Sequence, residues 1–178
     1  MNIVLTGYMA SGKTAVGTCL SKLCGFEFVD TDALIEEKCG MSISKIFEIS
    51  GEEYFRILEN EVIKEASKRD GAVISTGGGA VLNTENIAVL RENGVIVNLE
   101  PDEDVIRIRL GSGDSSRPLV KNSSMDEIIE RFKYRKPYYD NCDIKINVTN
   151  DKGIKETAEE ILKILEEKYE SEFWCSRK

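Results

Sequence analysis

The sequence predicts one α/β domain in which a parallel sheet of five strands lies between two layers of helices. Two observations lead to this prediction. Short apolar runs alternate with segments of helical apolar spacing, and no linker, repeat or low-complexity segment divides the 178 residues. Parallel strands need crossover connections, which the helical segments supply. A chain of this length can bury a core of its own.

Five segments are short and apolar, or alternate with the period of two that a half-buried strand shows. The predicted strands are residues 2–6, 26–30, 72–76, 95–100 and 143–149. The segments between and after them repeat their apolar residues at helical spacing. The predicted helices are residues 13–25, 31–40, 42–70, 84–94, 101–110, 125–141 and 152–173. We expect Gly25 to end the first helix, Gly51 to interrupt the third and Pro137 to end the sixth.

The composition excludes several classes of protein. With 41% hydrophobic and 31% charged residues it is that of an ordinary globular domain, and a net charge of −8 argues against general nucleic-acid binding. The five cysteines include no CxxC pair, so free thiols are expected rather than a zinc site or disulfides. No signal peptide or membrane span is visible, so a cytoplasmic protein is expected. The chain has no histidine, so a general base must be a carboxylate, lysine, cysteine or tyrosine.

The segment GYMASGKT, residues 7–14, fits the pattern G-x-x-x-x-G-K-[ST] of a phosphate-binding loop between a strand and a helix. Gly12 lets the backbone approach the phosphates, Lys13 would reach the β- and γ-phosphates, and the Thr14 hydroxyl would coordinate Mg²⁺. The loop residues expected to bind ATP are Ala10, Ser11, Gly12, Lys13, Thr14 and Ala15. A glycine-rich turn with an incidental lysine is the simpler alternative. Because the guanine-reading N-K-x-D motif and an ABC-type signature are missing, a small kinase remains as the interpretation.

The segment FVDTD places Asp30 and Asp32 at the carboxyl end of the second predicted strand, where open α/β sheets bind ligands. If that strand continued to Asp32, the two carboxylates would share one face of the sheet. Asp30 could hold Mg²⁺ through water, and Asp32 could accept a hydrogen bond from an acceptor hydroxyl. Helix capping by these side chains is the alternative interpretation.

Three glycines in a row, at residues 77–79, follow the third predicted strand. They remove side chains from the ligand-binding edge of the sheet, so that a substrate can lie against bare backbone. Arg56 has Glu52 and Glu59 one helical turn away on either side, so a surface salt-bridge network is one interpretation of that arginine.

Three further arginines lie in segments suited to binding anions. Arg117 ends a polar stretch, residues 111–124, that suits a mobile lid over the γ-phosphate. Arg131 and Arg135 are four residues apart on one face of a predicted helix, where a guanidinium could clamp a carboxylate.

Taken together, these segments resemble the shikimate kinase family. The resemblance rests on GYMASGKT, DTD, FRILE, TGGGAV, RPLV and RKPYY, which occur in the family's order and spacing over most of the chain. It implies a fold like that of nucleoside monophosphate kinases, with strand order 2-3-1-4-5. It also implies ATP-dependent phosphorylation of the 3-hydroxyl of shikimate, giving shikimate 3-phosphate and ADP, in chorismate and aromatic amino-acid biosynthesis.

The resemblance assigns the acceptor site. Asp32, Arg56, Gly78 and Arg135 would contact shikimate, with Gly79 lining the same wall. The two arginines would grip the carboxylate of shikimate. Asp32 would act on the 3-hydroxyl, either as a base or by orienting it for attack.

The resemblance also assigns the phosphate side of the site. Lys13 and Arg117 would stabilise the transferring phosphoryl group, while Thr14 and Asp30 would serve one Mg²⁺ ion bound with ATP.

In the family an arginine just before the lid packs on adenine, a role for which Arg109 is expected and Arg107 is the alternative. Two departures from the family stand out. Ala10 takes a place where glycine is frequent, which needs only a backbone conformation open to alanine, and the lid is one residue longer than in many members.

The expected partners are the small molecules ATP and shikimate, without nucleic acid or membrane, and the protein is expected to be a monomer of one domain, residues 1–178, with a frayed tail at 171–178. Two other functions remain open at this point. One is a related kinase that phosphorylates another small molecule, such as gluconate. The other is a nucleotide-binding regulator without catalysis.

Overall fold

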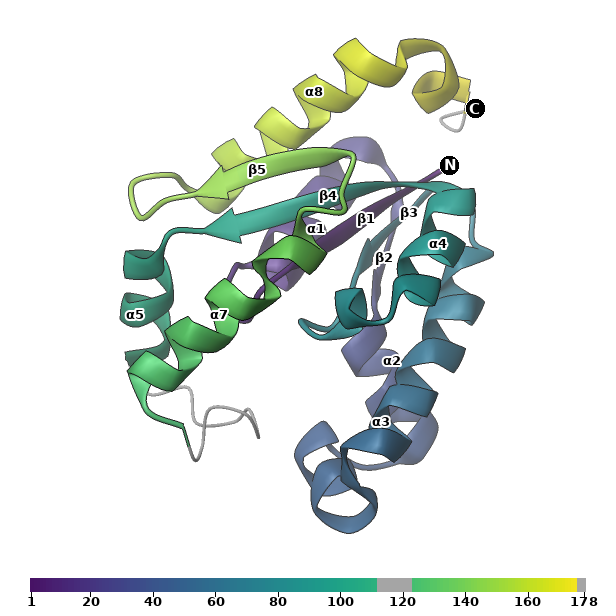
Figure 1. Ribbon diagram of the computed structural model, residues 1–178. Coiled ribbons are helices and arrows are strands. Elements are labelled where there is room, and N and C mark those ends of the chain that lie inside the picture. The colour runs from purple at the N-terminus through teal and green to yellow at the C-terminus, as the bar shows by residue number, and fades with distance from the viewer. Residues whose placement is uncertain (112–122, 176–178) are drawn as a thin grey trace.

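The computed structural model describes residues 1–111 and 123–175, with side chains described as far as residue 169. Its centre is one sheet of five parallel strands in the order β2-β3-β1-β4-β5, which confirms the predicted fold class and strand order (Figure 1). The strands are β1 (Asn2–Gly7), β2 (Glu27–Asp30), β3 (Ala72–Ser75), β4 (Gly94–Pro101) and β5 (Ile144–Val148).

Helices cover both faces of this sheet and make the three layers that the sequence predicts. The α-helices are α1 (Lys13–Cys24), α2 (Thr31–Cys39), α3 (Ile43–Ser67), α4 (Thr84–Glu92), α5 (Glu103–Gly111), α7 (Met125–Tyr139) and α8 (Ile154–Cys175). A short 3-10 helix, η1 (Ala80–Leu82), follows the glycine run. One face of the sheet packs against α1 and α8, and the other packs against α3, α4 and α7 (Figure 1).

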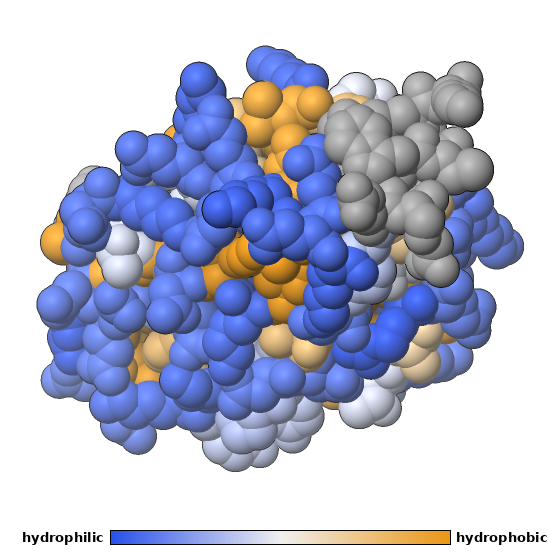
Figure 2. Space-filling model, turned by 90° about the horizontal axis from the view of Figure 1, so that it is seen from above, coloured by the Kyte–Doolittle hydropathy of each residue, from blue (hydrophilic) through white to orange (hydrophobic). Residues whose placement is uncertain are grey.

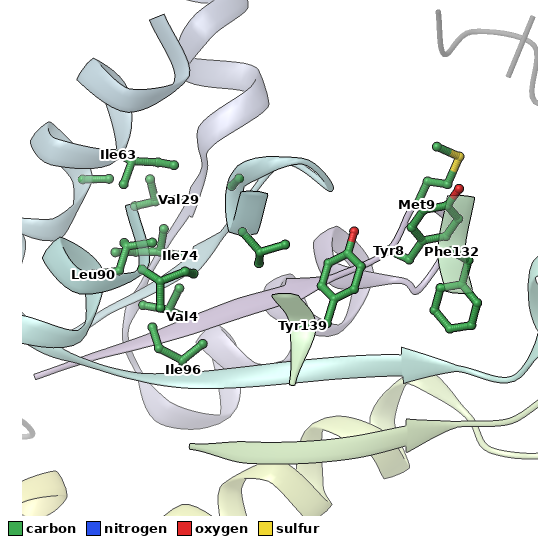
Figure 3. Close-up of a cluster of buried hydrophobic side chains, with 14 of the residues drawn as sticks. Val4, Tyr8, Met9, Val29, Ile63, Ile74, Leu90, Ile96, Phe132 and Tyr139 are labelled. Carbon is green, nitrogen blue, oxygen red and sulfur yellow. The ribbon is translucent and has the colours of Figure 1, made fainter. Parts of the chain in front are cut away.

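The alternation of side chains along β1 explains why the core has two halves. Ile3 and Leu5 point into the cluster with α1 and α8, whereas Val4 points into the cluster with α4 and α7. Each such residue is fully buried, which stabilises the fold by about 1.5–3 kcal/mol per side chain. Figure 3 shows the second cluster, with its aliphatic side chains at one end and three aromatic rings, those of Tyr8, Phe132 and Tyr139, at the other.

The outer faces of the helices are polar. Seen from the side of α8, the surface is mostly hydrophilic, with hydrophobic residues in small groups (Figure 2). The apolar residues of α8, among them Ile161 and Leu165, are buried against the sheet. None of the helices in the described part of the chain combines the length and apolarity needed to cross a membrane. Cys19, Cys24, Cys39 and Cys142 are free thiols, as predicted.

A third, smaller cluster lies where α2 and the first half of α3 extend beyond the sheet (Figure 1). Its buried members include Ile35 and Phe55. Gly51, at φ 78°, interrupts α3 as predicted, because only glycine adopts this conformation without strain. The break turns the first part of α3 back toward α2 and so shapes one wall of the site described below.

Two of the predicted element ends are wrong. The helix α7 does not end at Pro137 but continues to Tyr139, whose buried side chain anchors the last turn by a hydrogen bond to the glycine run. This tertiary contact outweighs the local penalty of a proline near the helix end. Pro101 ends β4 rather than starting the following helix.

The remaining ends lie within three residues of the predicted ones. Gly25 adopts the left-handed conformation at the end of α1. Ser124 starts α7 with a capping box, since its side chain accepts from the backbone of Glu127 while the carboxylate of Glu127 accepts from the backbone of Ser124. Most of the predicted lid, residues 112–122, lies outside the described residues. The helix α8 reaches Cys175, so the predicted frayed tail begins within a helix.

Candidate active site

Two adjoining pockets open at the carboxyl ends of the strands. The first, called here the phosphate-loop pocket, has a volume of about 290 Å³ and lies against residues 10–15 and Arg109. The second, called the glycine-wall pocket, has a volume of about 360 Å³ and lies between the glycine run and the helices α2, α3 and α7. Asp32 and Gly78 line both pockets. These two residues therefore mark the boundary at which a group could pass from one pocket to the other.

The phosphate loop wraps around the side chain of Lys13. The Lys13 ammonium group is buried and donates to the carbonyl oxygens of Gly7 and Tyr8 at 2.7 and 3.0 Å. Gly12 adopts φ 93°, which starts α1 with its first N–H groups turned toward the pocket. A Cβ at Gly7 would lie 2.5 Å from the carbonyl oxygen of Leu99, so only glycine fits there. The sequence therefore folds locally into a cradle for phosphate.

Ala10 is the strained residue of this loop. It adopts φ 61°, in the left-handed region, which costs a residue with a side chain about 1–2 kcal/mol. The expectation that its conformation would suit alanine is thus wrong. The carbonyl of Ala10 accepts a hydrogen bond from the Arg109 guanidinium at 2.8 Å, which helps to hold the strained turn in place.

The two arginines proposed to pack on adenine lie in different surroundings. Arg109 lines the phosphate-loop pocket, whereas Arg107 is exposed and pairs with Asp126 at 3.5 Å. Of these two arginines only Arg109 lines the phosphate-loop pocket, and its stacking on adenine stays a prediction. Arg117 lies outside the described residues.

Asp30 connects the phosphate loop to α2. Its Oδ1 accepts from the backbone N–H groups of Asp32 and Ala33 at 3.0 and 3.3 Å, so Asp30 is the N-cap of α2. Its Oδ2 accepts from the Thr14 hydroxyl at 2.9 Å. The capping interpretation is therefore correct, and it leaves the second oxygen beside Thr14. A hydroxyl and a carboxylate oxygen side by side suit a magnesium ion bound with phosphate and water.

Asp32 reaches the boundary of the pockets from the first turn of α2 rather than from the strand. The condition for both aspartates to share a face of β2 is not met, because the strand ends at Asp30 and the helix starts at Thr31, as the predicted elements have it. A Cβ at Gly77 would lie 2.6 Å from Oδ1 of Asp32 and 2.8 Å from Oε1 of Glu59. Gly77 is therefore glycine because two carboxylates occupy the space beside it.

Arg56 and Glu59 form a pair that is mostly withdrawn from water. Nη1 of Arg56 donates to Oε2 of Glu59 at 2.7 Å, and the Glu59 side chain is 2% exposed. The second partner, Glu52, accepts from Nη2 of Arg56 at 2.8 Å and is largely exposed. The predicted salt-bridge network exists, but its inner half lines a pocket. Burial raises the pKa of Glu59, and the charge of Arg56 opposes that rise.

Gly79 makes room for the arginine. A Cβ at Gly79 would overlap the guanidinium of Arg56 and lie 2.6 Å from its Nη2. Arg135 lines the same pocket from α7, and it forms no ion pair with any carboxylate among the described residues. The glycine-wall pocket thus has one neutralised arginine and one whose charge faces the pocket without a carboxylate partner. That pocket is suited to an anion.

The sequence did not identify three kinds of residue in this site. Glu59 was visible only as a salt-bridge partner of Arg56, and its spacing of three residues was the available signal. The apolar wall, with Ile43, Phe47 and Phe55, has the composition of any helix packing face. Tyr139 follows Pro137, where the helix was expected to have ended.

Taken together, a phosphate loop and an adjoining anion pocket with a carboxylate at their boundary define a P-loop kinase for a small acceptor. Comparisons with known proteins narrow this class. A model of the family described as shikimate kinase matches residues 9–166. The shikimate kinase of Caldicellulosiruptor bescii is 48% identical, covering 82% of this chain and 85% of its own length. The shikimate kinase of Caldanaerobacter subterraneus subsp. tengcongensis is 46% identical, covering 91% of this chain and 94% of its own length.

A solved structure agrees with these relatives. Shikimate kinase from Acinetobacter baumannii in complex with shikimate matches with a TM-score of 0.87 and 36% identity, covering 94% of each chain. The present chain belongs to the shikimate kinase family.

Proposed function

We propose that this chain transfers the γ-phosphoryl group of ATP to the 3-hydroxyl of shikimate, giving shikimate 3-phosphate and ADP. The central observation is the pair of adjoining pockets, because Asp32 stands at their boundary and two arginines line the one away from the phosphate loop. Family membership and the complex of the Acinetobacter baumannii relative with shikimate support the choice of acceptor.

In this proposal the acceptor binds in the glycine-wall pocket through its carboxylate. Arg135 supplies a charge that no described carboxylate neutralises. Arg56 has five N–H donors, of which three are engaged by Glu52 and Glu59, and it offers the other two. The buried Glu59 fixes the plane of the Arg56 guanidinium, so that little rotamer entropy is lost on binding.

The hydroxyl end of the acceptor then lies beside Asp32. The carboxylate of Asp32 accepts a hydrogen bond from the 3-hydroxyl and points the oxygen toward the phosphate-loop pocket. Phosphoryl transfer passes through a loose transition state, so this orientation contributes more than removal of the proton before attack. The glycine run allows the approach because Gly78, which lines both pockets, adds no side chain there.

On the phosphate side, Lys13 exchanges its bonds to the carbonyls of Gly7 and Tyr8 for phosphate oxygens. The Thr14 hydroxyl, and Asp30 through water, would hold a magnesium ion, which neutralises charge on the phosphates when it is bound. Arg109 contacts the nucleotide next to the phosphate loop. Arg117, from the predicted lid, contacts the γ-phosphoryl group during its transfer.

The remaining expectations belong to the same proposal. The active species in this proposal is a monomer of one domain, residues 1–178. It acts in the cytoplasm, where ATP is available. A lid at residues 111–124 stays a prediction. Light scattering of the purified protein, with and without shikimate, measures the mass of the active species.

The test of the activity is the release of ADP. ADP release should require both ATP and shikimate, and the product should be shikimate 3-phosphate by mass spectrometry. Gluconate offered as the acceptor should give no more than the background rate. Equal rates with gluconate, or ATP binding without turnover of shikimate, would overturn the proposal in favour of another kinase or of a regulator.

A further inference from the structure

The phenol of Tyr139 forms a hydrogen bond to Gly78, the glycine that lines both pockets. Tyr139 is 3% exposed, and its hydroxyl donates to the carbonyl oxygen of Gly78 at 2.5 Å. This bond joins the end of α7 to a segment 61 residues earlier in the chain. It is also the contact that keeps α7 helical beyond Pro137.

Gly78 is the glycine that both pockets share. On its other side, Gly78 lies close to the phosphate-loop backbone, since a Cβ placed there would be 3.5 Å from the Met9 nitrogen and 3.7 Å from the Gly7 oxygen. A displacement of the Gly78 carbonyl would therefore change the surface against which the acceptor lies. The position of that carbonyl is fixed by Tyr139.

The same phenol also interacts with the arginine of the carboxylate clamp. Arg135 lies four residues before Tyr139, on the same face of α7. Burial raises the pKa of Tyr139, and the charge of Arg135 and a hydrogen bond from that side chain oppose the rise. The phenol that donates to the carbonyl of Gly78 therefore lies close to the guanidinium of Arg135.

We propose that Tyr139 is a positioning residue for the acceptor, because its hydrogen bond to the carbonyl of Gly78 keeps the end of α7, which carries Arg135, in register with the glycine run. This inference rests on the proposed function, since it concerns the shikimate side of the same site. Tyr139 itself lines neither pocket and acts through Arg135 and Gly78. Its loss is expected to weaken acceptor binding and to leave ATP binding unchanged.

The chain contains a matched control in Tyr8. Tyr8 lies in the same buried cluster, with its ring 6.3 Å from that of Tyr139 (Figure 3). Its hydroxyl also donates to a backbone carbonyl, that of Ile128 at 2.9 Å, and burial raises its pKa while the charges of Arg131 and Arg135 on α7 oppose that rise. Ile128 and Arg131 line neither pocket. Tyr8→Phe therefore removes an equivalent buried hydroxyl without touching the acceptor wall.

The experiment compares wild type, Tyr139→Phe and Tyr8→Phe by steady-state kinetics, by calorimetric binding of shikimate and by thermal unfolding. Loss of one hydrogen bond in each variant should lower Tm by a similar few degrees. Tyr139→Phe should raise KM and Kd for shikimate about three- to tenfold, the range that one net hydrogen bond gives. Its KM for ATP should stay within about twofold of wild type. Tyr8→Phe should leave the Kd for shikimate within about twofold, and any kinetic effect should fall on ATP.

The outcomes separate this inference from the proposed function. If wild type does not turn over shikimate, the proposed function fails first. If wild type is active and Tyr139→Phe binds shikimate as tightly as wild type, the positioning role is wrong. The role is also wrong if both variants weaken shikimate binding equally, because the cause would then be general loss of packing.

Discussion

The two pockets of this enzyme are built in different ways. In the phosphate-loop pocket, which other segments also line, the phosphate cradle itself comes from one continuous segment, in which the backbone of residues 7–15 forms the turn and Lys13 is held by carbonyls of its own loop. The glycine-wall pocket takes its groups from four separate segments, around Asp32, Arg56, Gly78 and Arg135. A change in the first pocket should therefore act mainly on the local backbone. A change in the second should act on the fit between distant elements.

Asp32 is the residue that joins the two pockets, so its replacement should have the largest effect. Asp32→Asn keeps the size of the side chain but removes the charge that accepts the acceptor hydroxyl. We expect kcat to fall about 100-fold or more, within the range of positioned carboxylates, while the Kd for ATP stays within about threefold. Single-turnover kinetics and calorimetry of ATP binding measure the two quantities. Full activity in this variant would remove Asp32 from the mechanism.

The next largest effect should come from filling the space at Gly79. In Gly79→Ala the new methyl group overlaps the guanidinium of Arg56, which must move away from the pocket. Because charge-assisted hydrogen bonds contribute about 1.5–3 kcal/mol, KM for shikimate should rise about 10- to 100-fold with KM for ATP nearly unchanged.

A suitable control for Gly79→Ala is Gly153→Ala, where the nearest neighbour of the new Cβ would be 3.6 Å away. That variant lies in the loop before α8 and should be kinetically like wild type. If Gly79→Ala raised the two Michaelis constants equally, the pockets would not be independent in the way described above.

The buried carboxylate of Glu59 provides a third test, based on pH. Its pKa is raised by burial, so the folded protein retains this proton at pH values where the unfolded chain loses it. The stability contributed by protonated Glu59 is complete below the ordinary pKa and is lost as pH rises through the raised value. Relative to Glu59→Gln, wild type should therefore lose stability as pH increases above about 4.5, where an unperturbed glutamate begins to ionise.

Urea unfolding of wild type and Glu59→Gln at several pH values measures this difference. A difference that grows in favour of wild type as pH rises would contradict the expected direction. In the kinetic assay, Glu59→Gln should raise KM for shikimate about three- to tenfold, because the neutral amide holds Arg56 less firmly. Glu52→Gln removes the exposed partner and should have the smaller effect.

The contrast between the pockets also explains what the sequence could predict. The phosphate loop could be recognised from its residue types and their spacing, because strand, loop, Lys13 and helix follow one another directly in the sequence. The glycine-wall pocket was placed by family resemblance, because neither spacing nor periodicity brings Arg56, Gly78 and Arg135 together. The structure supplies the physical reason for the glycines, namely the carboxylates beside Gly77 and the guanidinium beside Gly79.

The errors arose where tertiary contacts outweigh local rules. Pro137 was expected to end its helix, but the buried phenol of Tyr139 holds the next turn. The burial of Glu59 could not be predicted. A glutamate three residues after an arginine gives the same sequence pattern whether the pair is exposed or lines a pocket.

The smallest expected effect belongs to the phosphate loop and tests its strained residue. Ala10→Gly removes the Cβ that disfavours φ 61°, a gain of about 1–2 kcal/mol that is partly offset by the greater freedom of glycine in the unfolded chain. We expect a net gain of about 0.5 kcal/mol in the free energy of unfolding, with ATP affinity within about twofold of wild type. As a control, Ala33→Gly on the exposed face of α2 should lose about 0.5–1 kcal/mol. Urea unfolding measures both variants. A loss of stability in Ala10→Gly as large as that in Ala33→Gly would mean that Arg109, by holding the Ala10 carbonyl, already compensates for the strain.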